Sequence, residues 1–258
     1  MCSWRINPGG GTRLRPWGWP GVCVVDCSGL CRELAGLLVV EDDAAGLGIR
    51  VAYSLSWGRP VRELDPGRLV AEEEKLLAEL RERYRVEELP RDPLVRTYRD
   101  FYWRIGIDPT KTRPSSEALV RRALRGKWPR INPVVDAGNI ASARMMVPVG
   151  LYDAAKFKPP LRITLARGGE EFHPIGGKPE KLEQGTPILV DGDGRVMHVY
   201  PHRDSVETMV AQDTTCILIV AAGVPGVQRE QLVETVKEVQ RLVGLLGWSS
   251  CSRVEAKP

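Results

Sequence analysis

The sequence has few of the residues that metal chemistry requires, and it lacks the long apolar segments that membranes require. Its 258 residues include only three histidines, and its six cysteines contain no Cys-x-x-Cys pair. No apolar stretch approaches the roughly 20 residues that span a bilayer. The N-terminus also lacks the apolar core of a secretory signal peptide. We therefore expect a cytoplasmic protein without membrane contact, metal or other cofactor.

The spacing of the cysteines and histidines gives no metal site either. Cys23, Cys27 and Cys31 follow one another at intervals of four, and a metal site would need a fourth ligand that is not found nearby. We predict that these cysteines are small buried apolar residues. His198 and His202 have i, i+4 spacing, but the proline between them argues against a helix.

What is present is typical of a globular α+β protein. Hydrophobic residues make up 43% and charged residues 27% of the chain. Apolar runs predict strands at 22–27, 47–55, 161–166, 187–191, 195–200 and 215–222, with a DGDG hairpin turn at 191–194. Periodic patterns predict helices at 66–84, 97–105, 115–124, 132–145 and 228–246. Because strands and helices do not alternate strictly, we predict a mixed or antiparallel sheet flanked by helices.

The composition changes along the chain and suggests four parts. Residues 1–20 are rich in Gly, Pro, Arg and Trp, and we expect a mobile tail there. Residues 21–89 are predicted to form an N-terminal α/β portion that packs on a main domain at 90–247. Residues 248–258 are expected to form a C-terminal tail.

Basic residues are concentrated in the middle of the chain. The net charge is only +4, but the stretch from Arg91 to Arg130 holds eleven basic residues and four acidic ones. Such a belt suits a polyanionic partner, although a solvated helical surface is the alternative. The candidates for RNA contact are Arg113, Arg121, Arg122, Arg125 and Lys127. Trp103 and Trp128 could stack on an unpaired base, but we predict that they pack in the core.

Four features appear in a characteristic order from residue 136 onward. Asp136 and Asn139 form an Asp-x-x-Asn turn into a helix, and a Pro-x-x-x-x-Asp segment follows at 148–153. A strand led by a basic residue comes next, at 162–166, and then a Gly-Glu-x-Phe hairpin at 169–172. This order resembles the tRNA-editing domain of the phenylalanyl-tRNA synthetase beta subunit and its free-standing relatives, and the resemblance extends over residues 90–245.

The resemblance implies a function. The editing domain hydrolyses the ester of tRNA that carries a wrong amino acid, which in the synthetase is tyrosine. A free-standing copy would act in trans on mischarged tRNA, without DNA as a partner. Nothing in the sequence resembles the ATP-dependent catalytic module, so we do not expect ligase activity. The oligomeric state is not indicated.

Two departures from the family pattern concern the pocket. Gly150 stands where the synthetase has a histidine. Asp204 is the nearest match to a glutamate that recognises the tyrosine hydroxyl there. The resemblance therefore implies a pocket for a different amino acid.

The chemistry requires little from the protein, because aminoacyl-tRNA is an activated ester. A positioned water, donors for the developing oxyanion and a selective pocket are sufficient, so no nucleophile is needed. We predict the catalytic residues Asn139, Ser142, His202 and Asp204. The predicted substrate-binding residues are Asp136, Gly150, Arg203, Ser205, Thr208 and Thr214.

Each of these residues also has a structural interpretation. Asp136 and Asn139 could cap a helix, Ser142 could be a packing residue, and Arg203 could pair with Asp204 on the surface. His202 could be a core or surface imidazole, and the two threonines could be ordinary strand residues. The functional interpretation requires a polar cleft between the Asn139 helix and the Arg203–Asp204 segment.

Two other functions remain open from the sequence. The chain could bind tRNA or another RNA without hydrolysis, since Gly150 replaces the family histidine. It could instead hydrolyse or bind a small amino-acid derivative, with the basic belt as a plain surface.

Overall fold

The computed structural model describes residues 26–258, so the predicted tail at 1–20 and most of the predicted strand at 22–27 lie outside the described residues. The helices are α1 (Cys27–Arg32), α2 (Leu34–Leu37), α3 (Asp42–Gly46), α4 (Gly67–Arg83), α5 (Pro93–Arg104), α6 (Ser115–Leu124), α7 (Pro133–Met145) and α8 (Arg229–Leu245), with short 3-10 turns η1 (Val61–Glu63) and η2 (Leu89–Arg91). The strands are β1 (Leu38–Val40), β2 (Arg50–Trp57), β3 (Val149–Asp153), β4 (Leu161–Leu165), β5 (Glu171–Phe172), β6 (Glu180–Lys181), β7 (Pro187–Val190), β8 (Val196–Val199), β9 (Arg203–Asp204), β10 (Cys216–Gly223), β11 (Ser249–Ser250) and β12 (Glu255–Lys257).

The strands of the described part form two five-stranded sheets and one small hairpin. The first sheet has the order β1-β4-β7-β8-β9, with β1 and β4 parallel and the other pairs antiparallel. The second sheet is antiparallel and has the order β11-β2-β10-β3, with β12 also paired to β2. The hairpin joins β5 and β6. The predicted α+β class with mixed and antiparallel sheets is confirmed.

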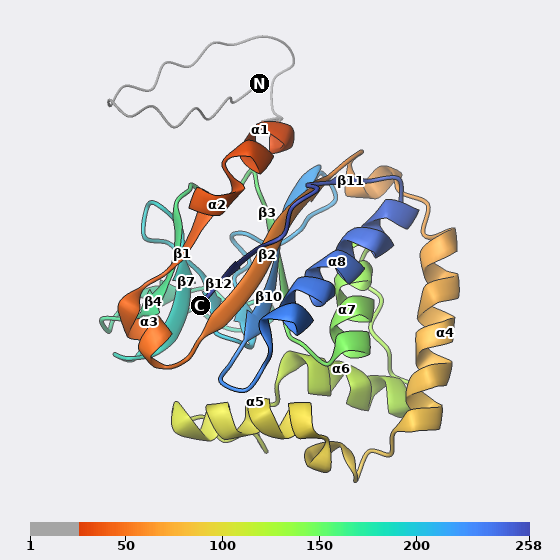
Figure 1. Cartoon of the computed structure of the whole chain (residues 1–258), viewed down its shortest axis with the longest axis horizontal. Coiled ribbons are helices and arrows are strands. Elements are labelled where there is room, and N and C mark those ends of the chain that lie inside the picture. The colour runs from red at the N-terminus through yellow and green to blue at the C-terminus, as the bar shows by residue number, and fades with distance from the viewer. Residues whose placement is uncertain (1–25) are drawn as a thin grey trace.

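The second sheet is the middle layer of the molecule. β10 lies at its centre, and all eight of its residues are buried, which explains its uninterrupted apolar sequence CILIVAAG. Helices α7 and α8 pack on one face of this sheet (Figure 1). Leu161, Leu189 and Met197 of the first sheet share one hydrophobic core with β10. The molecule therefore has three layers, in which helices α7 and α8 come first, the second sheet lies in the middle and the first sheet follows.

Helix α7 begins where a side chain can cap it. The Asn132 carboxamide oxygen accepts a hydrogen bond from the Val135 amide at 3.0 Å, and the Asp136 carboxylate accepts one from the Ile131 amide at 2.8 Å. The cap is therefore Asn132, and Asp136 lies within the first turn rather than in a turn before the helix. Asn139 lies almost one turn further along, in the interior of the helix.

Several predicted details differ from the structure. Ser115 and Ser116, either of which could have capped the helix predicted at 115–124, do not cap α6 with their side chains, because Ser115 is already helical and Pro114 precedes it. Cys27 begins α1 rather than ending a strand. Trp103 is 58% exposed and does not pack in the core, because it lies on the outer face of α5. Trp128 is half-buried and packs against the core, as predicted.

Strands from both ends of the described part of the chain belong to the second sheet. β2 lies next to β10, so residues 26–89 share a sheet with the main domain rather than packing on it from outside. Residues 248–258, which we expected to form a tail, contain β11 and β12, and both strands pair with β2. Backbone hydrogen bonding to β2 explains why this polar segment is ordered.

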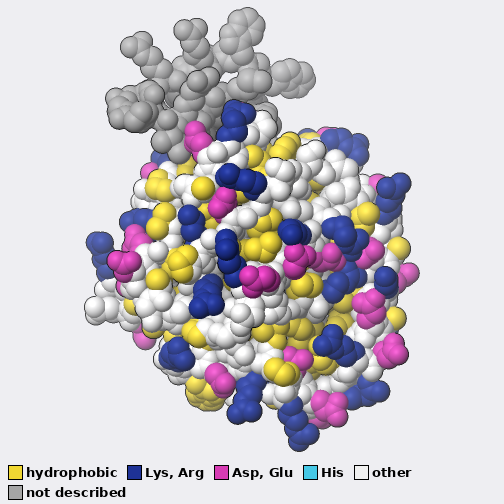
Figure 2. Space-filling view, viewed as in Figure 1, with side chains coloured by type: hydrophobic (Ala, Val, Ile, Leu, Met, Phe, Trp, Pro, Cys, Tyr) yellow, Lys and Arg dark blue, Asp and Glu magenta, His cyan; other side chains and the backbone are white. Residues whose placement is uncertain are grey.

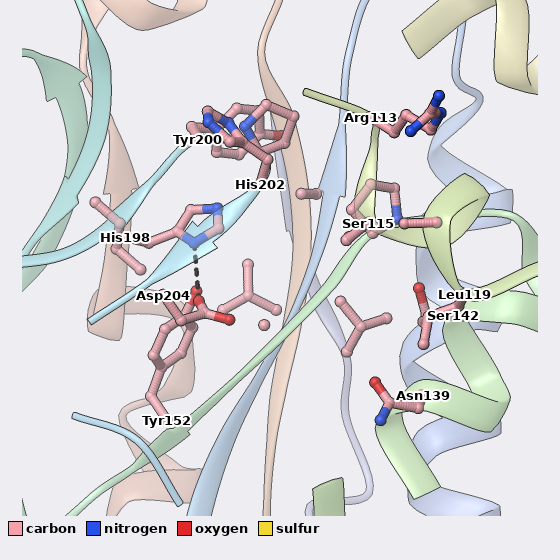
Figure 3. Close-up of a pocket in the computed structure, with 18 of the residues that line it drawn as sticks. Arg113, Ser115, Leu119, Asn139, Ser142, Tyr152, His198, Tyr200, His202 and Asp204 are labelled. Carbon is pink, nitrogen blue, oxygen red and sulfur yellow. Dashed lines mark hydrogen bonds and ion pairs between the residues drawn. The ribbon is translucent and has the colours of Figure 1, made fainter. Parts of the chain in front are cut away.

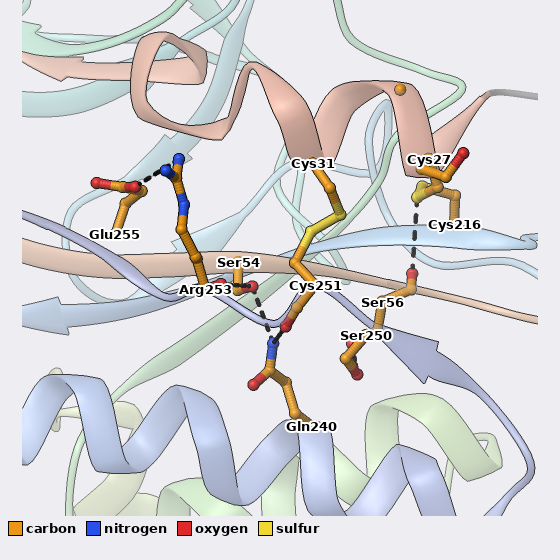
Figure 4. Close-up of a disulfide and its surroundings, with 12 residues drawn as sticks. Cys27, Cys31, Ser54, Ser56, Cys216, Gln240, Ser250, Cys251, Arg253 and Glu255 are labelled. Atoms are coloured by element: carbon orange, nitrogen blue, oxygen red, sulfur yellow. Dashed lines mark hydrogen bonds and ion pairs between the residues drawn. A yellow bond between two sulfur atoms is a disulfide. The ribbon is translucent and has the colours of Figure 1, made fainter.

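Two disulfides reinforce the same region. Cys27 pairs with Cys216 and Cys31 with Cys251, with Cα–Cα distances of 6.2 and 5.7 Å (Figure 4). We predicted small buried apolar residues at these positions. Cys27 is indeed buried in the core, but Cys27 and Cys31 both form disulfides, which the prediction missed. Their intervals of four place both on the side of α1 that faces the sheet, but their partners lie 189 and 220 residues away in sequence.

The surface seen in Figure 2 carries acidic and basic side chains that are interspersed, without a large patch of one sign. None of the helices in residues 26–258 combines the length and apolar character needed to cross a bilayer.

Candidate functional site

A cavity of about 510 Å³ is lined by residues of both sheets and of helices α6 and α7. Strands β3 and β10 contribute to it from the second sheet, and β8 and β9 from the first (Figure 3). Asn139 on α7 and Asp204 on β9 line this same cavity, as the predicted cleft requires. Its polar lining residues are Lys111, Arg113, Ser115, Arg121, Arg122, Arg125, Asn139, Ser142, Tyr152, His198, Tyr200, His202 and Asp204.

The sheet side of the cavity is built around an aspartate–histidine pair. His198 and Asp204 face each other across the β8–β9 ladder, and Asp204 Oδ1 lies 2.8 Å from His198 Nδ1. The rings of Tyr152 and Tyr200 pack edge-on against His198, with centroids 6.3 and 6.0 Å away. Aromatic packing fixes the imidazole, and the imidazole in turn fixes the carboxylate.

Tyr152 fills the space beside Gly150. The two residues are separated by one position on β3, so they share a face of the strand. A Cβ atom added at Gly150 would overlap the Tyr152 hydroxyl. Burial, followed by the charge of Asp204 and a hydrogen bond with it, raises the pKa of Tyr152 well above its usual value. A neutral phenol therefore stands beside the position where the resembled family has a histidine.

His202 lies at the upper end of the cavity as drawn in Figure 3. Burial, with smaller contributions from the charges of His198 and Arg203, lowers the pKa of His202 to about 3. The imidazole is therefore neutral at pH 7. Its Nδ1 atom is buried without a hydrogen-bond partner among the described residues, and its ring lies 5.6 Å from that of Tyr102. A neutral imidazole can accept a hydrogen bond from water.

The helix side contributes two polar side chains from α7. The Ser142 hydroxyl donates to the Val147 carbonyl at 2.7 Å, which fixes the end of the helix and occupies the only proton of this group. The Asn139 amide extends toward the cavity (Figure 3) and is half-buried. Asn139 is therefore available to donate to a ligand, whereas Ser142 is engaged in the fold.

The mouth of the cavity is cationic. Arg121 is held by the fully buried Glu117, 2.7 Å away, which also binds Arg99 at 2.6 Å. Burial by itself would raise the pKa of Glu117, but the hydrogen bonds from the two arginines outweigh it and lower this pKa. The salt bridges formed within residues 26–258 involve none of Lys111, Arg113, Arg122 and Arg125, so these four charges face the opening without a partner there.

The other predicted site residues lie elsewhere. Arg203 binds Glu180 at 2.6 Å, not Asp204. Thr214 donates to the buried Asp153 at 2.6 Å and anchors a turn. Six predicted residues do not line the cavity, namely Asp136, Arg203, Ser205, Thr208, Thr214 and Lys127.

Four polar lining residues were not predicted to belong to the site, namely Lys111, Ser115, Tyr152 and Tyr200, and His198 was considered only as a metal ligand. His198 carries a signal, because it interrupts the buried run VMHV, and a buried histidine requires a partner. Tyr152 carries none, since a tyrosine in a strand is ordinary. No group of three His, Cys, Asp or Glu side chains with metal-binding geometry occurs within residues 26–258.

Comparisons with known proteins agree with the resemblance seen in the sequence. The family model of the B3/4 domain matches residues 97–238. The phenylalanine–tRNA ligase beta subunit of Pasteurella multocida is 31% identical over 81 residues, which are 31% of this chain and 10% of that protein. The beta subunit of Paramagnetospirillum magneticum is 36% identical over 64 residues, covering 25% of this chain and 8% of that protein.

A solved N-terminal fragment of the phenylalanyl-tRNA synthetase beta subunit from Pyrococcus horikoshii aligns with 86% of this chain and 54% of that one, at a TM-score of 0.46 and 16% identity. The sequence matches span only about a tenth of the length of these ligase subunits. The family match, by contrast, covers more than half of the present chain and includes every residue that lines the cavity. The chain therefore belongs to the B3/4 domain family and is similar to the B3/4 part of phenylalanine–tRNA ligase beta subunits.

Proposed function

We propose that this protein is an aminoacyl-tRNA deacylase that acts in trans on mischarged tRNA. The observation that carries the proposal is the combination, in one cavity, of a cationic mouth with a polar interior that includes a neutral imidazole. The mouth suits the phosphates of a tRNA 3′ end, and the interior suits an aminoacyl ester. Residues 90–247 would carry this activity, with 21–89 as structural support.

The residues support a water-mediated hydrolysis. His202 positions the attacking water by accepting a hydrogen bond from it, because the imidazole is neutral at pH 7. A pKa of about 3 makes this imidazole a weak base, so the proton of the water passes to the departing ribose oxygen as the ester bond breaks. The Asn139 amide donates to the oxygen that becomes negative as water adds to the ester carbonyl. The neighbouring ribose hydroxyl of the tRNA assists the leaving group. Neither a covalent intermediate nor a cofactor is required for these steps.

The decisive experiment is release of labelled amino acid from a complete set of charged tRNAs. We expect one or a few aminoacyl groups to be removed, and we expect Asn139→Ala to slow the removal about 100-fold. Lys237→Ala, an exposed substitution on α8, is the control and should retain the wild-type rate. A full screen without any hydrolysis would refute the deacylase.

A tRNA-binding module without hydrolysis is the second candidate, and Gly150 at the family histidine position favours it. The same screen separates the two, because a binding module would retain charged tRNA intact. A third candidate, an enzyme or binder for a small amino-acid derivative, predicts RNA binding that is weak and barely dependent on salt.

The proposed substrate implies the cytoplasm, where tRNA is charged and used. Two disulfides in that compartment are unusual except in organisms whose intracellular proteins carry them, as hyperthermophile proteins do.

A further inference from the structure

The two walls of the cavity carry opposite charge. Asp204 is the only carboxylate among the described residues that line it. The α6 side and the loop before it supply five cations, namely Lys111, Arg113, Arg121, Arg122 and Arg125. None of these cations forms a salt bridge with Asp204, so the carboxylate and the cationic mouth are separate features of one site.

Asp204 is held in place by several contacts. Its Oδ1 atom is 2.8 Å from His198 Nδ1, and its backbone carbonyl accepts from the Ile175 amide at 2.9 Å. The side chain is 32% exposed, and Figure 3 shows the second carboxylate oxygen turned toward the open space in front of α7. A fixed carboxylate oxygen, which can accept a hydrogen bond, therefore faces the ligand space.

A partly buried carboxylate that faces a cavity favours a cationic ligand group, because a charge removed from water requires a partner. Every aminoacyl ester on the 3′ end of RNA carries one such group, its α-ammonium, and for most amino acids this is its only cation. The rest of that end is anionic and matches the opposite wall. The cationic and anionic groups of the ligand are thus complementary to the acidic and basic walls of the cavity.

We propose that Asp204 binds the α-ammonium of the aminoacyl group, so that the site takes esters with a free amine and rejects N-acylated ones, such as formylated or peptidyl esters. This assignment rests on the proposed function and replaces the side-chain recognition that the family resemblance implied for Asp204. His198 is the positioning residue, since it touches the carboxylate rather than the ligand. Acylation removes the charge and leaves Asp204 without its partner, which we expect to weaken binding about 10- to 100-fold.

Binding of stable analogues tests this without any catalytic step. The probes are 3′-amino-3′-deoxyadenosine carrying alanine or phenylalanine in amide linkage, each with a free or an N-acetylated amine. Titration calorimetry at pH 6.5, where an α-amine is protonated, should show that the free forms bind wild-type protein 10- to 100-fold more tightly. Asp204→Asn should remove this preference, whereas Asp100→Asn, at an exposed site on α5, should retain it.

The proposal and the deacylase can fail separately. Equal binding of free and acetylated probes, a preference that survives Asp204→Asn, or no binding of either free probe would overturn the role of Asp204. Hydrolysis of charged tRNA in the screen would still establish the deacylase in any of those cases. Conversely, a strong preference for the free amine without hydrolysis would support the ammonium site in a binding module.

Discussion

At the scale of single residues, His202 links the cavity to the pH dependence of stability. Its pKa is about 3 in the folded protein and 6.5 when unperturbed, so between these values the unfolded chain binds more protons. The stability that the neutral imidazole contributes is therefore complete above pH 6.5 and declines as the pH falls toward 3. The buried ring, rather than any catalytic step, sets this window.

We expect His202→Gln to reduce the loss of stability between pH 6.5 and pH 5. Wild-type protein should lose roughly 1 to 2 kcal/mol more than the variant over this range, because one unit of pKa shift corresponds to about 1.4 kcal/mol. Urea denaturation of both proteins at the two pH values measures the difference. Parallel declines in the two proteins would show that the imidazole titrates normally in the fold.

Also at the scale of single residues, position 150 is occupied by glycine because the side chain of Tyr152 fills the adjacent space. Gly150→Ala forces the added methyl group against the Tyr152 hydroxyl, and we expect it to cost about 1 to 3 kcal/mol of unfolding free energy. Removing that hydroxyl in the double variant Gly150→Ala with Tyr152→Phe should recover part of the loss. Thermal denaturation of the three variants and the wild type completes the cycle. Additive effects would mean that the two positions do not interact.

At the scale of elements, helix α6 separates its arginines into two groups. Arg121 is occupied by Glu117, whereas Arg122 and Arg125 are exposed at the cavity mouth. Charge reversal at Arg121 would bring a second carboxylate next to a buried one and disturb the fold. Arg122 and Arg125 are therefore the better positions at which to test RNA contact.

We expect Arg122→Glu with Arg125→Glu to weaken tRNA binding and to reduce the slope of log affinity against log salt by about 1 to 2, since two phosphate contacts are lost. Arg68→Glu with Lys75→Glu makes the same charge change on exposed positions of α4, which does not line the cavity. Filter binding at several salt concentrations compares the two variants. An equal effect of both would point to net charge rather than a docking surface.

At the scale of the whole molecule, the disulfides join α1 to two parts of the second sheet. One partner is Cys216, the first residue of the central strand β10, and the other is Cys251, which follows β11. Gln240 of α8 donates to Ser54 and to the Cys251 carbonyl, so the C-terminal bridge lies against the helical layer (Figure 4). Each bridge closes a loop of about two hundred residues. Cross-links that close long loops restrict the unfolded chain more than those that close short ones.

We expect Cys31→Ser with Cys251→Ser to lower the unfolding free energy by about 2 to 4 kcal/mol. Reduction of wild-type protein with dithiothreitol should cause a similar or larger loss, because both bridges are then open. A variant in which Cys27, Cys31, Cys216 and Cys251 are all serine should not respond to the reductant. If a thiol assay shows that the bridges of the reduced wild-type protein are open and its denaturation midpoint is unchanged, the bridges do not contribute to stability.

The sequence determined the parts of this protein that depend on local pattern. Helical periodicity identified α4, α5, α6, α7 and α8 to within a few residues. Unbroken apolar runs identified β7 and β10, and a run that alternates apolar and polar residues identified β4. Those patterns arise from how each element buries one or both of its faces, so they are visible without the partner. The order of features from Asp136 to Phe172 was likewise sufficient to identify the family.

Only the tertiary structure decided which side chains meet. The disulfides, the pairing of β12 with β2, and the contact of His198 with Asp204 join residues whose partners are chosen by strand register and by how the sheets pack. The raised pKa of Tyr152 and the neutral state of His202 were also decided by the tertiary structure, because both side chains are buried only when the layers are assembled. The local pattern of apolar and polar residues determines which helices and strands form. Which residues come into contact when they are about two hundred positions apart in sequence is determined by the fold.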